Sequence, residues 1–297
     1  MREEAITYRA HGKVNLYLDV LNRRYDGFTN IETIFQSVGL ADDLTFTPGG
    51  DAVTLTCSHA GVPLDDTNLV ARAAALLRPR ASAPSGCAVH IEKRLPVAGG
   101  MAGGSADCAA ALVAFNELWQ CGLDDAGLIA AALELGSDIP FCLRGGTLAA
   151  TGRGEIFHPL RPLPETWLVL LLPGIPISAG SLYNHPQLER SLETPVEGFT
   201  PAFLYAIEAC ERGALDRLVF NRMELPAFID HPGLVHWKEQ LLESGCTAAA
   251  MSGSGSTLFG VCAGREQAEA IAASGFECAA LAVPTVQAGV QRLDPAP

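Results

Sequence analysis

The feature of this sequence that most constrains its fold is a glycine-rich loop at residues 96–106. Residues 88–92, just before it, alternate like a β-strand, and residues 107–119 form a helix-forming run with little to interrupt it. A loop between a strand and a helix lets the backbone adopt positive φ and approach an anion closely, while the free N–H groups of the helix point to the same place. The sequence therefore predicts a phosphate-binding loop.

This loop matches neither of the common nucleotide-binding motifs. Ser105 follows Gly104 and no lysine comes after it, so it is not a Walker A loop, and its glycines do not have the GxGxxG spacing. A tight turn that packs a helix on a sheet is the alternative interpretation. Four glycines within six residues exceed what a turn needs, so the pattern favours the phosphate loop: Gly99, Gly100, Gly103 and Gly104.

The length of 297 residues predicts two domains, or one large one. Charged residues make up 18% and hydrophobic residues 48% of the chain, which excludes a disordered protein. Three prolines fall within residues 158–164, and we place a domain boundary there. The predicted domains are residues 1–160 and 161–297.

The net charge indicates which partners the protein can bind, and the cysteine pattern indicates whether its thiols are reduced. A formal net charge of -13 leaves no broad basic surface for nucleic acid or for anionic lipid. Apolar runs such as residues 167–172 are too short to span a bilayer, and the acidic, polar start is unlike a signal peptide, so we expect a cytoplasmic protein. The nine cysteines show no CxxC or metal-like spacing, which predicts reduced, mostly buried thiols and no zinc site.

The rest of the chain alternates strand-like and helix-like segments. We expect strands at residues 6–20 (interrupted at Gly12), 33–38, 44–46, 53–57 and 167–172. We expect helices at residues 69–77, 125–135, 201–212 and 234–243. Strong turn formers at residues 48–51 predict that segments 44–46 and 53–57 form a hairpin.

Two further segments are candidates for chemistry. Asp138 lies just before an apolar, strand-like stretch, and on its own it is more simply explained as a helix cap or a turn residue. Residues 252–256 read Ser-Gly-Ser-Gly-Ser between apolar flanks. This segment is either a flexible connection or a second functional loop.

Taken together and in this order, these segments resemble the GHMP kinase superfamily and, within it, the 4-diphosphocytidyl-2-C-methyl-D-erythritol kinases. The resemblance runs nearly end to end. It rests on Gly12-Lys13-Val14-Asn15-Leu16, Arg24, Asp26-Gly27, Thr33, Phe35, Gln36, and residues 96–106, 136–141, 145–155 and 251–256. It implies an α+β, two-domain GHMP kinase fold, with a ribosomal S5 domain 2-like N-terminal domain, a ferredoxin-like C-terminal domain and an active site in the cleft between them.

The resemblance also implies a reaction, in which ATP with Mg²⁺ phosphorylates the 2-hydroxyl of a cytidine diphosphate-linked methylerythritol. Asp138 matches the catalytic carboxylate, and Lys13 matches the lysine that holds this carboxylate and polarises the alcohol. Asn15 would orient the substrate or the lysine, Ser105 would lie near the phosphates and the magnesium ion, and residues 252–256 would close over both ligands. The implied ATP-binding residues are Pro96, Val97, Ala98, Gly99, Gly100, Met101, Ala102, Gly103, Gly104, Ser105 and Ala106.

The sequence differs from the family at the positions that recognise the cytosine. Phe28 and Thr29 stand where Tyr-His is usual, and Ser178 belongs to a Ser-Thr pair whose threonine is replaced by Ala179. Phe28 and Tyr183 occupy places where the family stacks the cytosine, and stacking tolerates the loss of a hydroxyl. The implied substrate-binding residues are Asn15, Phe28, Thr29, Ser178 and Tyr183.

Two alternatives stay open beside the leading hypothesis, and the departures favour the first of them. One is a GHMP-type kinase that acts on a different small alcohol. The other is a catalytically silent nucleotide-binding protein, although such a protein does not need both Lys13 and Asp138. Each hypothesis has a small-molecule partner, and both a monomer and a homodimer are compatible with the sequence.

Overall fold

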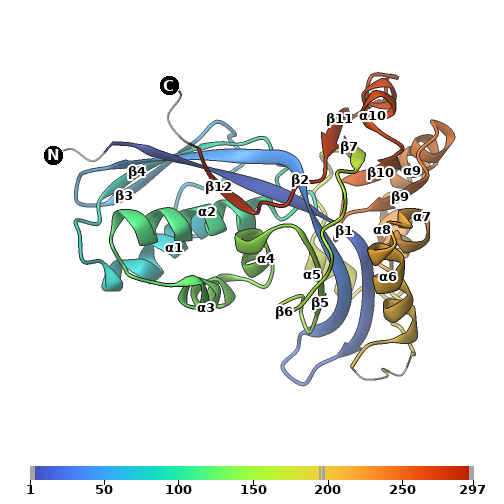
Figure 1. The fold of residues 1–297 in the computed structure, drawn as a ribbon, viewed down its shortest axis with the longest axis horizontal. Coiled ribbons are helices and arrows are strands. Elements are labelled where there is room, and N and C mark those ends of the chain that lie inside the picture. Colours follow the sequence, from blue (N-terminus) through green and yellow to red (C-terminus); the bar gives the residue numbers. More distant parts are fainter. Residues whose placement is uncertain (1–3, 194, 196–197, 294–297) are drawn as a thin grey trace.

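The computed structural model describes residues 4–193, 195 and 198–293. Within them, the chain forms two β-sheets that lie side by side, each with helices against it (Figure 1). Eight strands belong to the first sheet and four to the second. The mixed α+β class expected from the sequence is confirmed.

The first sheet is dominated by two long antiparallel strands, β1 (Ile6–Arg23) and β2 (Thr29–Pro48). Both run from the left half of the molecule in Figure 1 into the right half. The main path of the sheet is β12-β1-β2-β4-β3. Its other strands are β3 (Val53–Cys57), β4 (Cys87–Glu92), β5 (Thr147–Thr151), β6 (Ile156–Pro159), β8 (Phe220–Asn221) and β12 (Val290–Leu293).

Alanine- and leucine-rich helices cover one face of this sheet and bury its core. They are α1 (Leu69–Leu77), α2 (Gly103–Leu118), α3 (Asp125–Leu135) and α4 (Ile139–Arg144), with a short 3₁₀ turn η1 (Arg78–Arg80) after α1. Phe115 of α2 packs edge-on against Phe46 of β2 and stacks on Trp119 with their ring centroids 4.2 Å apart. This packing fixes α2 against the sheet, and the glycine loop lies at its N-terminal end.

The second sheet has the strand order β11-β7-β10-β9, and all of its pairs are antiparallel. Its strands are β7 (Trp167–Leu172), β9 (Ala248–Met251), β10 (Leu258–Cys262) and β11 (Ala279–Pro284). Of the helical segments after β7, α6 (Pro201–Glu211) and α7 (Leu215–Leu218) pack against β2 and β1 of the first sheet. The others, α5 (Ala179–Tyr183), α8 (Glu224–Asp230), α9 (Gly233–Glu243) and α10 (Arg265–Ala272), accompany the second sheet. With α9 and α10 packed on it, this unit has the β-α-β-β-α-β pattern of a ferredoxin-like fold, as expected.

The predicted boundary near residue 160 falls between β6 of the first sheet and β7 of the second. Two later strands return to the first sheet, where β8 pairs with β1 in parallel and β12 pairs with it antiparallel. The division into residues 1–160 and 161–297 stays a proposal.

Three expectations about local structure are wrong. Gly12 does not interrupt β1, which continues through a register shift between His11 and Lys13. Strands β2 and β3 are not a hairpin, because β4 lies between them and α1 belongs to a crossover that makes β3 parallel to β4. The stretch after Asp138 is helix α4, which has a proline in its first turn; so short an apolar run does not distinguish strand from helix.

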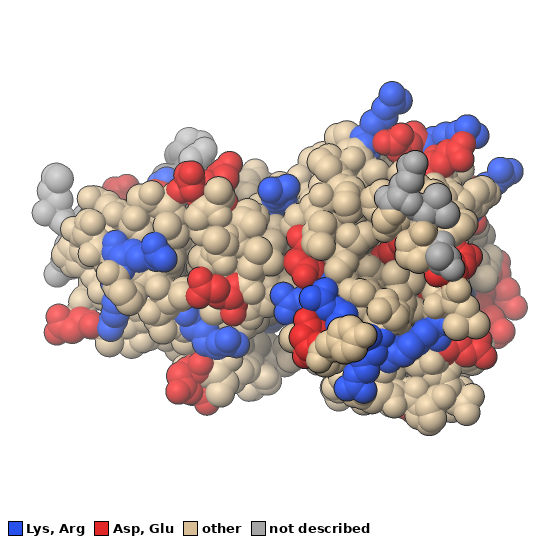
Figure 2. All heavy atoms as spheres, turned by 90° about the horizontal axis from the view of Figure 1, so that it is seen from below, with Lys and Arg blue, Asp and Glu red and all other residues tan. Residues whose placement is uncertain are grey.

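The surface charges, the helix lengths and the cysteines can be compared with the expectations from composition. Acidic and basic side chains are interspersed on the face seen in Figure 2, with several basic ones grouped near its middle. Through the described part of the chain, helices long and apolar enough to cross a membrane are absent. All nine cysteines are free thiols, and six of them are buried, as the sequence predicted.

Candidate active site

The glycine loop connects the end of β4 to the first turn of α2. The helix begins at Gly103, earlier than the helix-forming run suggested, so Gly104 and Ser105 lie in its first turn. Positive φ angles of 53° at Ala98, 78° at Gly100 and 59° at Ala102 curl the backbone. The loop thus presents a helix N-terminus, where unpaired N–H groups and the helix dipole favour an anion.

This loop also contacts the serine-rich loop at residues 252–256. The carbonyl of Gly100 accepts a 2.9 Å hydrogen bond from Oγ of Ser252, and the carbonyl of Gly99 accepts one of 3.2 Å from the amide of Thr257. A Cβ on Gly100 would stand 2.0 Å from the carbonyl oxygen of Ser252. Only glycine permits this approach, so the two halves of the molecule meet at the loop.

The side chain of Asn221 holds the serine-rich loop in place by two hydrogen bonds. Its buried amide nitrogen donates hydrogen bonds of 2.6 Å to the carbonyl of Met251 and 2.8 Å to the carbonyl of Gly253. Gly253, at φ +55°, thereby lies against the ammonium group of Lys13. The loop is therefore a fixed part of the site rather than a flexible connection.

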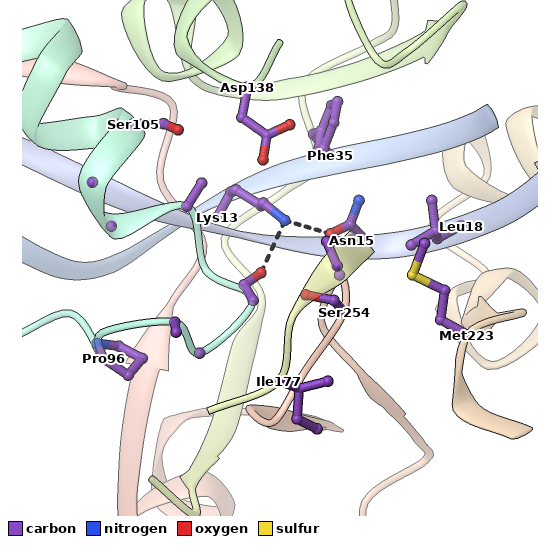
Figure 3. Close-up of a pocket in the computed structure, with 18 of the residues that line it drawn as sticks. Lys13, Asn15, Leu18, Phe35, Pro96, Ser105, Asp138, Ile177, Met223 and Ser254 are labelled. Carbon is purple, nitrogen blue, oxygen red and sulfur yellow. Dashed lines mark hydrogen bonds between the residues drawn. The ribbon is translucent and has the colours of Figure 1, made fainter. Parts of the chain in front are cut away.

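Lys13 projects from β1 into the cleft between the halves and is 4% exposed. Its Nζ donates hydrogen bonds of 2.6 Å to Oδ1 of Asn15 and 2.9 Å to the carbonyl of Gly100 (Figure 3). Asn15 in turn donates to Oγ1 of Thr33 at 2.8 Å. Burial lowers the pKa of Lys13, while the negative charge of Asp138 acts in the opposite direction.

Asp138 precedes α4 and faces Lys13 across the cleft (Figure 3). It occupies the N-cap position, yet its side chain accepts no capping hydrogen bond, which argues against the helix-cap interpretation. Among the described residues, Lys13 forms no ion pair with Asp138, whereas the resemblance implied that it holds this carboxylate; its ammonium group donates to Asn15 and Gly100. The carboxylate is thus left available to a ligand, with the hydroxyl of Ser105 beside it (Figure 3).

Three neighbouring pockets surround the glycine loop. We name them the central pocket, of about 380 Å³, the outer pocket, of about 500 Å³, and the side pocket, of about 220 Å³. The central pocket contains Lys13, Asn15, Asp138, Gly253, Ser254 and most of the glycine loop. It shares Ser105, Asp138, Arg153, Ala179 and Tyr183 with the outer pocket, and Leu69, Ala98 and Gly104 with the side pocket. A ligand in either flanking pocket therefore reaches the same centre.

Four of the five expected substrate-side residues line the pockets, and Asn15 is in the central one. Phe28, Thr29 and Tyr183 line the outer pocket, together with Asp138. Ser178 lines none of the three pockets, since it lies exposed before α5, where its carbonyl accepts a hydrogen bond from Ser181. Within the glycine loop, Val97 lines the side pocket, whereas the side chains of Met101 and Ala106 are buried.

Sequence reasoning missed Arg153, which lines both the central and the outer pocket. Its guanidinium carbon lies 4.6 Å from the ring centroid of Phe28, and its Nε lies 3.3 Å from a carboxylate oxygen of Glu155. Because Phe28 is half exposed, this cation–π contact stabilises the observed placement of the ring by about 0.5–1 kcal/mol. The only available signal was its place between Gly152 and Gly154 in a turn after a strand.

Two family models match this chain. Residues 68–146 match the GHMP kinases N terminal domain, and residues 206–277 match the GHMP kinases C terminal domain. A 4-diphosphocytidyl-2-C-methyl-D-erythritol kinase of a Synechococcus species is 40% identical over 89% of this chain and 87% of that protein. The chain belongs to the GHMP kinases. Its family within them is that of the 4-diphosphocytidyl-2-C-methyl-D-erythritol kinases, and it is a small-molecule kinase, which implies the use of ATP.

Other relatives agree with this assignment. The Enterococcus faecalis kinase of the same name is 39% identical over 90% of this GHMP kinase and 93% of its own length. A crystal structure of a 4-(cytidine 5'-diphospho)-2C-methyl-D-erythritol kinase superposes with a TM-score of 0.78 at 33% identity, covering 94% of this chain and 98% of the other. A homoserine kinase from Cytophaga hutchinsonii, at 16% identity, a TM-score of 0.75 and coverages of 99% and 98%, shares the fold.

Proposed function

We propose that this kinase transfers the γ-phosphoryl group of ATP to the 2-hydroxyl of 4-diphosphocytidyl-2-C-methyl-D-erythritol, a step in non-mevalonate isoprenoid precursor biosynthesis. One observation carries the proposal: a single central pocket contains the glycine loop, Lys13 and Asp138, in a chain 40% identical to kinases of that name. The pocket provides an anion site, a cation and an uncommitted carboxylate. A phosphoryl transfer to an alcohol needs these three groups.

The nucleotide is proposed to lie along the side and central pockets. Its phosphates fit the N-terminal turn of α2 at Gly103, Gly104 and Ser105, where backbone N–H groups are unpaired. The side pocket adjoins this turn and offers room for the nucleoside. It is lined by apolar Val62, Pro63, Leu69 and Val97 and by polar Thr67, Asn68, Lys93 and Asp107. The remaining loop residues shape the backbone, since Met101 and Ala106 are buried.

A magnesium ion fits the oxygen donors at this centre. The described residues hold no cluster of three metal-ligating side chains, so the nucleotide phosphates would supply most of the ligands. The hydroxyl of Ser105 lines the same pocket and would complete the set. When bound, the ion neutralises phosphate charge that builds up during transfer.

Asp138 is proposed as the general base. It accepts the proton of the acceptor hydroxyl as that oxygen forms its bond to the γ-phosphorus and ADP leaves. Lys13, fixed by Asn15 and Gly100, places its positive charge beside the reacting oxygens. Because the ammonium group has fixed acceptors, its charge is in place before the substrate binds, which is how electrostatic preorganisation stabilises a transition state.

The acceptor is proposed to occupy the outer pocket. Phe28 and Tyr183 provide aromatic surfaces for the cytosine, and Arg153 supplies a cation for the diphosphate between the base and the reacting alcohol. Thr29 is too short to reach as far as the family histidine. Its hydroxyl oxygen lies 3.5 Å from a guanidinium nitrogen of Arg190, so water or backbone groups would contact the base edge.

The proposed function is tested by measuring ADP release with a panel of acceptors. The panel contains the cytidine substrate, mevalonate, homoserine and galactose, each with MgATP and the wild-type protein. We expect kcat/KM for the cytidine substrate to exceed the others by at least about 10³, because the outer pocket would bind the base and the diphosphate remote from the reaction. A preference for an acceptor without a base would establish a different small-alcohol kinase, and nucleotide binding without any turnover would establish a silent homologue.

A further inference from the structure

A buried ionic cluster adjoins the glycine loop, and two of its members, Lys93 and Asp107, also line the side pocket. Nζ of Lys93 is 2.6 Å from Oδ2 of Asp42 on β2 and 2.6 Å from Oδ2 of Asp107 on α2. Each of these three side chains is at most 5% exposed. The cluster thus joins the sheet, the segment before the loop and the helix after it.

Each end of the loop is tied to this cluster. Oδ1 of Asp42 accepts hydrogen bonds from the amides of Arg94 at 2.6 Å and Leu95 at 2.8 Å, just before the loop begins. At the other end, Asp107 is in the second turn of α2, and a Cβ on Gly103 would stand 3.1 Å from Nζ of Lys93. A single ammonium group therefore connects the backbone that enters the loop with the helix that leaves it.

A buried ionic cluster is a costly way to stabilise a core. Two carboxylates and one ammonium carry a net charge of -1, and each buried ion loses its hydration, which is unfavourable. Oδ1 of Asp107 is buried and finds no hydrogen-bond partner within the described residues. Well-packed apolar residues stabilise a core as well or better than buried ions do, whereas fixed charges define one geometry.

We propose that Lys93, with Asp42 and Asp107, is a positioning residue that holds the glycine loop in its nucleotide-binding conformation before the nucleotide arrives. The loop then loses little conformational entropy on binding. This proposal concerns only the nucleotide half of the proposed function. The identity of the acceptor alcohol does not affect it.

The test uses the double variant Lys93→Met/Asp107→Asn, which removes the tether and keeps the net charge of the cluster at -1. Asp42 remains to hold the amides of Arg94 and Leu95. The matched control is Arg9→Met, which breaks the ion pair with Asp43, the neighbour of Asp42 on β2. Both variants and the wild type are measured at pH 8.

Two measurements decide the outcome. Without nucleotide, amide hydrogen exchange at residues 97–103 should be about ten-fold faster in the double variant, and unchanged at residues 252–256 and in the control. With the non-hydrolysable β,γ-imido analogue of ATP and Mg²⁺, calorimetry should give a Kd about ten-fold weaker for the double variant only. If nucleotide-free exchange at residues 97–103 is unchanged, the positioning role is overturned, even if the Kd weakens, because Lys93 would then act by direct contact.

Global loosening also counts against the proposal. If exchange rises equally at residues 97–103 and throughout α2 and β4, the cluster serves stability alone. Failure of the wild type to bind the analogue would instead refute the proposed function. The nucleotide-free exchange comparison would still decide the role of Lys93, because it needs no nucleotide.

Discussion

The ammonium group of Lys13 donates a 2.6 Å hydrogen bond to the side-chain oxygen of Asn15, two residues further along the same strand. A spacing of two places both side chains on one face of β1, the face that lines the central pocket. The bond, with a second one to the carbonyl of Gly100, fixes the ammonium group in the cleft. Asp138, at the N-cap of α4, faces the same space and keeps its carboxylate free for the substrate hydroxyl.

Replacing this carboxylate tests the proposed base. Asp138→Asn should lower kcat by about 10²–10⁴, the usual effect of losing a positioned base, and should leave ATP binding and the melting temperature nearly unchanged. The side chain makes no capping bond, so the amide leaves no partner unsatisfied. Steady-state kinetics and thermal melting check both parts. A variant within a few-fold of the wild-type kcat would remove Asp138 from the catalytic role.

The phosphate loop is tested at Gly104, which lines both the central and the side pocket. A Cβ there meets nothing nearer than 3.8 Å, so Gly104→Ala should fold as well as the wild type. The added methyl group nevertheless projects where the phosphates are proposed to lie, and we expect Kd for ATP to rise about ten-fold or more.

Gly233→Ala is the matched control for this change. Gly233 begins α9 in the second half of the molecule, and a Cβ there meets no atom within 4 Å. It should leave both ATP affinity and melting temperature unaltered. Equal ATP affinity in the Gly104→Ala protein would favour the simple-turn interpretation of the loop.

How far the sequence predicted this site depends on whether each feature has a local signature. Glycine spacing between a strand and a helix is local, so the position of the loop at residues 96–106 was predictable. The partner of a strand is not local, which explains why β4 between β2 and β3 was missed. Helix α4 was missed because its six residues are too few for a helical period to be visible.

Charged residues show the same contrast. Lys13 and Asp138 were identified only through the family resemblance, and the structure places both in the central pocket. Arg153 and Lys93 are lone charges in sequence, and only the fold brings them to Phe28 and to Asp107. Ser178 is the opposite case. It matches one residue of the family's Ser-Thr pair in sequence, yet it lies outside the three pockets.

The acceptor side is tested at the aromatic surface. Phe28→Ala should raise KM for the cytidine substrate about ten-fold, because a stacked base contributes about 1–3 kcal/mol. It should change kcat little, since the base lies far from the transferred phosphoryl group. Thr29→His should lower this KM or leave it unchanged. Initial-rate kinetics at saturating ATP measure both, and an unchanged KM for Phe28→Ala would refute cytosine stacking at this residue.

The ionic cluster at Lys93 makes the stability of the protein depend on pH. Burial, together with the charge of Asp42, raises the pKa of Asp107 to about 7, against the pull of Lys93, whereas an unperturbed aspartate ionises near 3.8. Between these values the native state holds a proton that the unfolded state has released. This contribution to stability is therefore fully present below about pH 4 and is lost as the pH rises through 7.

The variant Asp107→Asn lacks this contribution, so the wild-type melting temperature should fall relative to that of the variant between pH 4.5 and 8. Other titrating groups are common to both proteins and largely cancel in this difference. Melting curves at constant ionic strength give the comparison, and two parallel profiles would show that Asp107 is already ionised throughout this range.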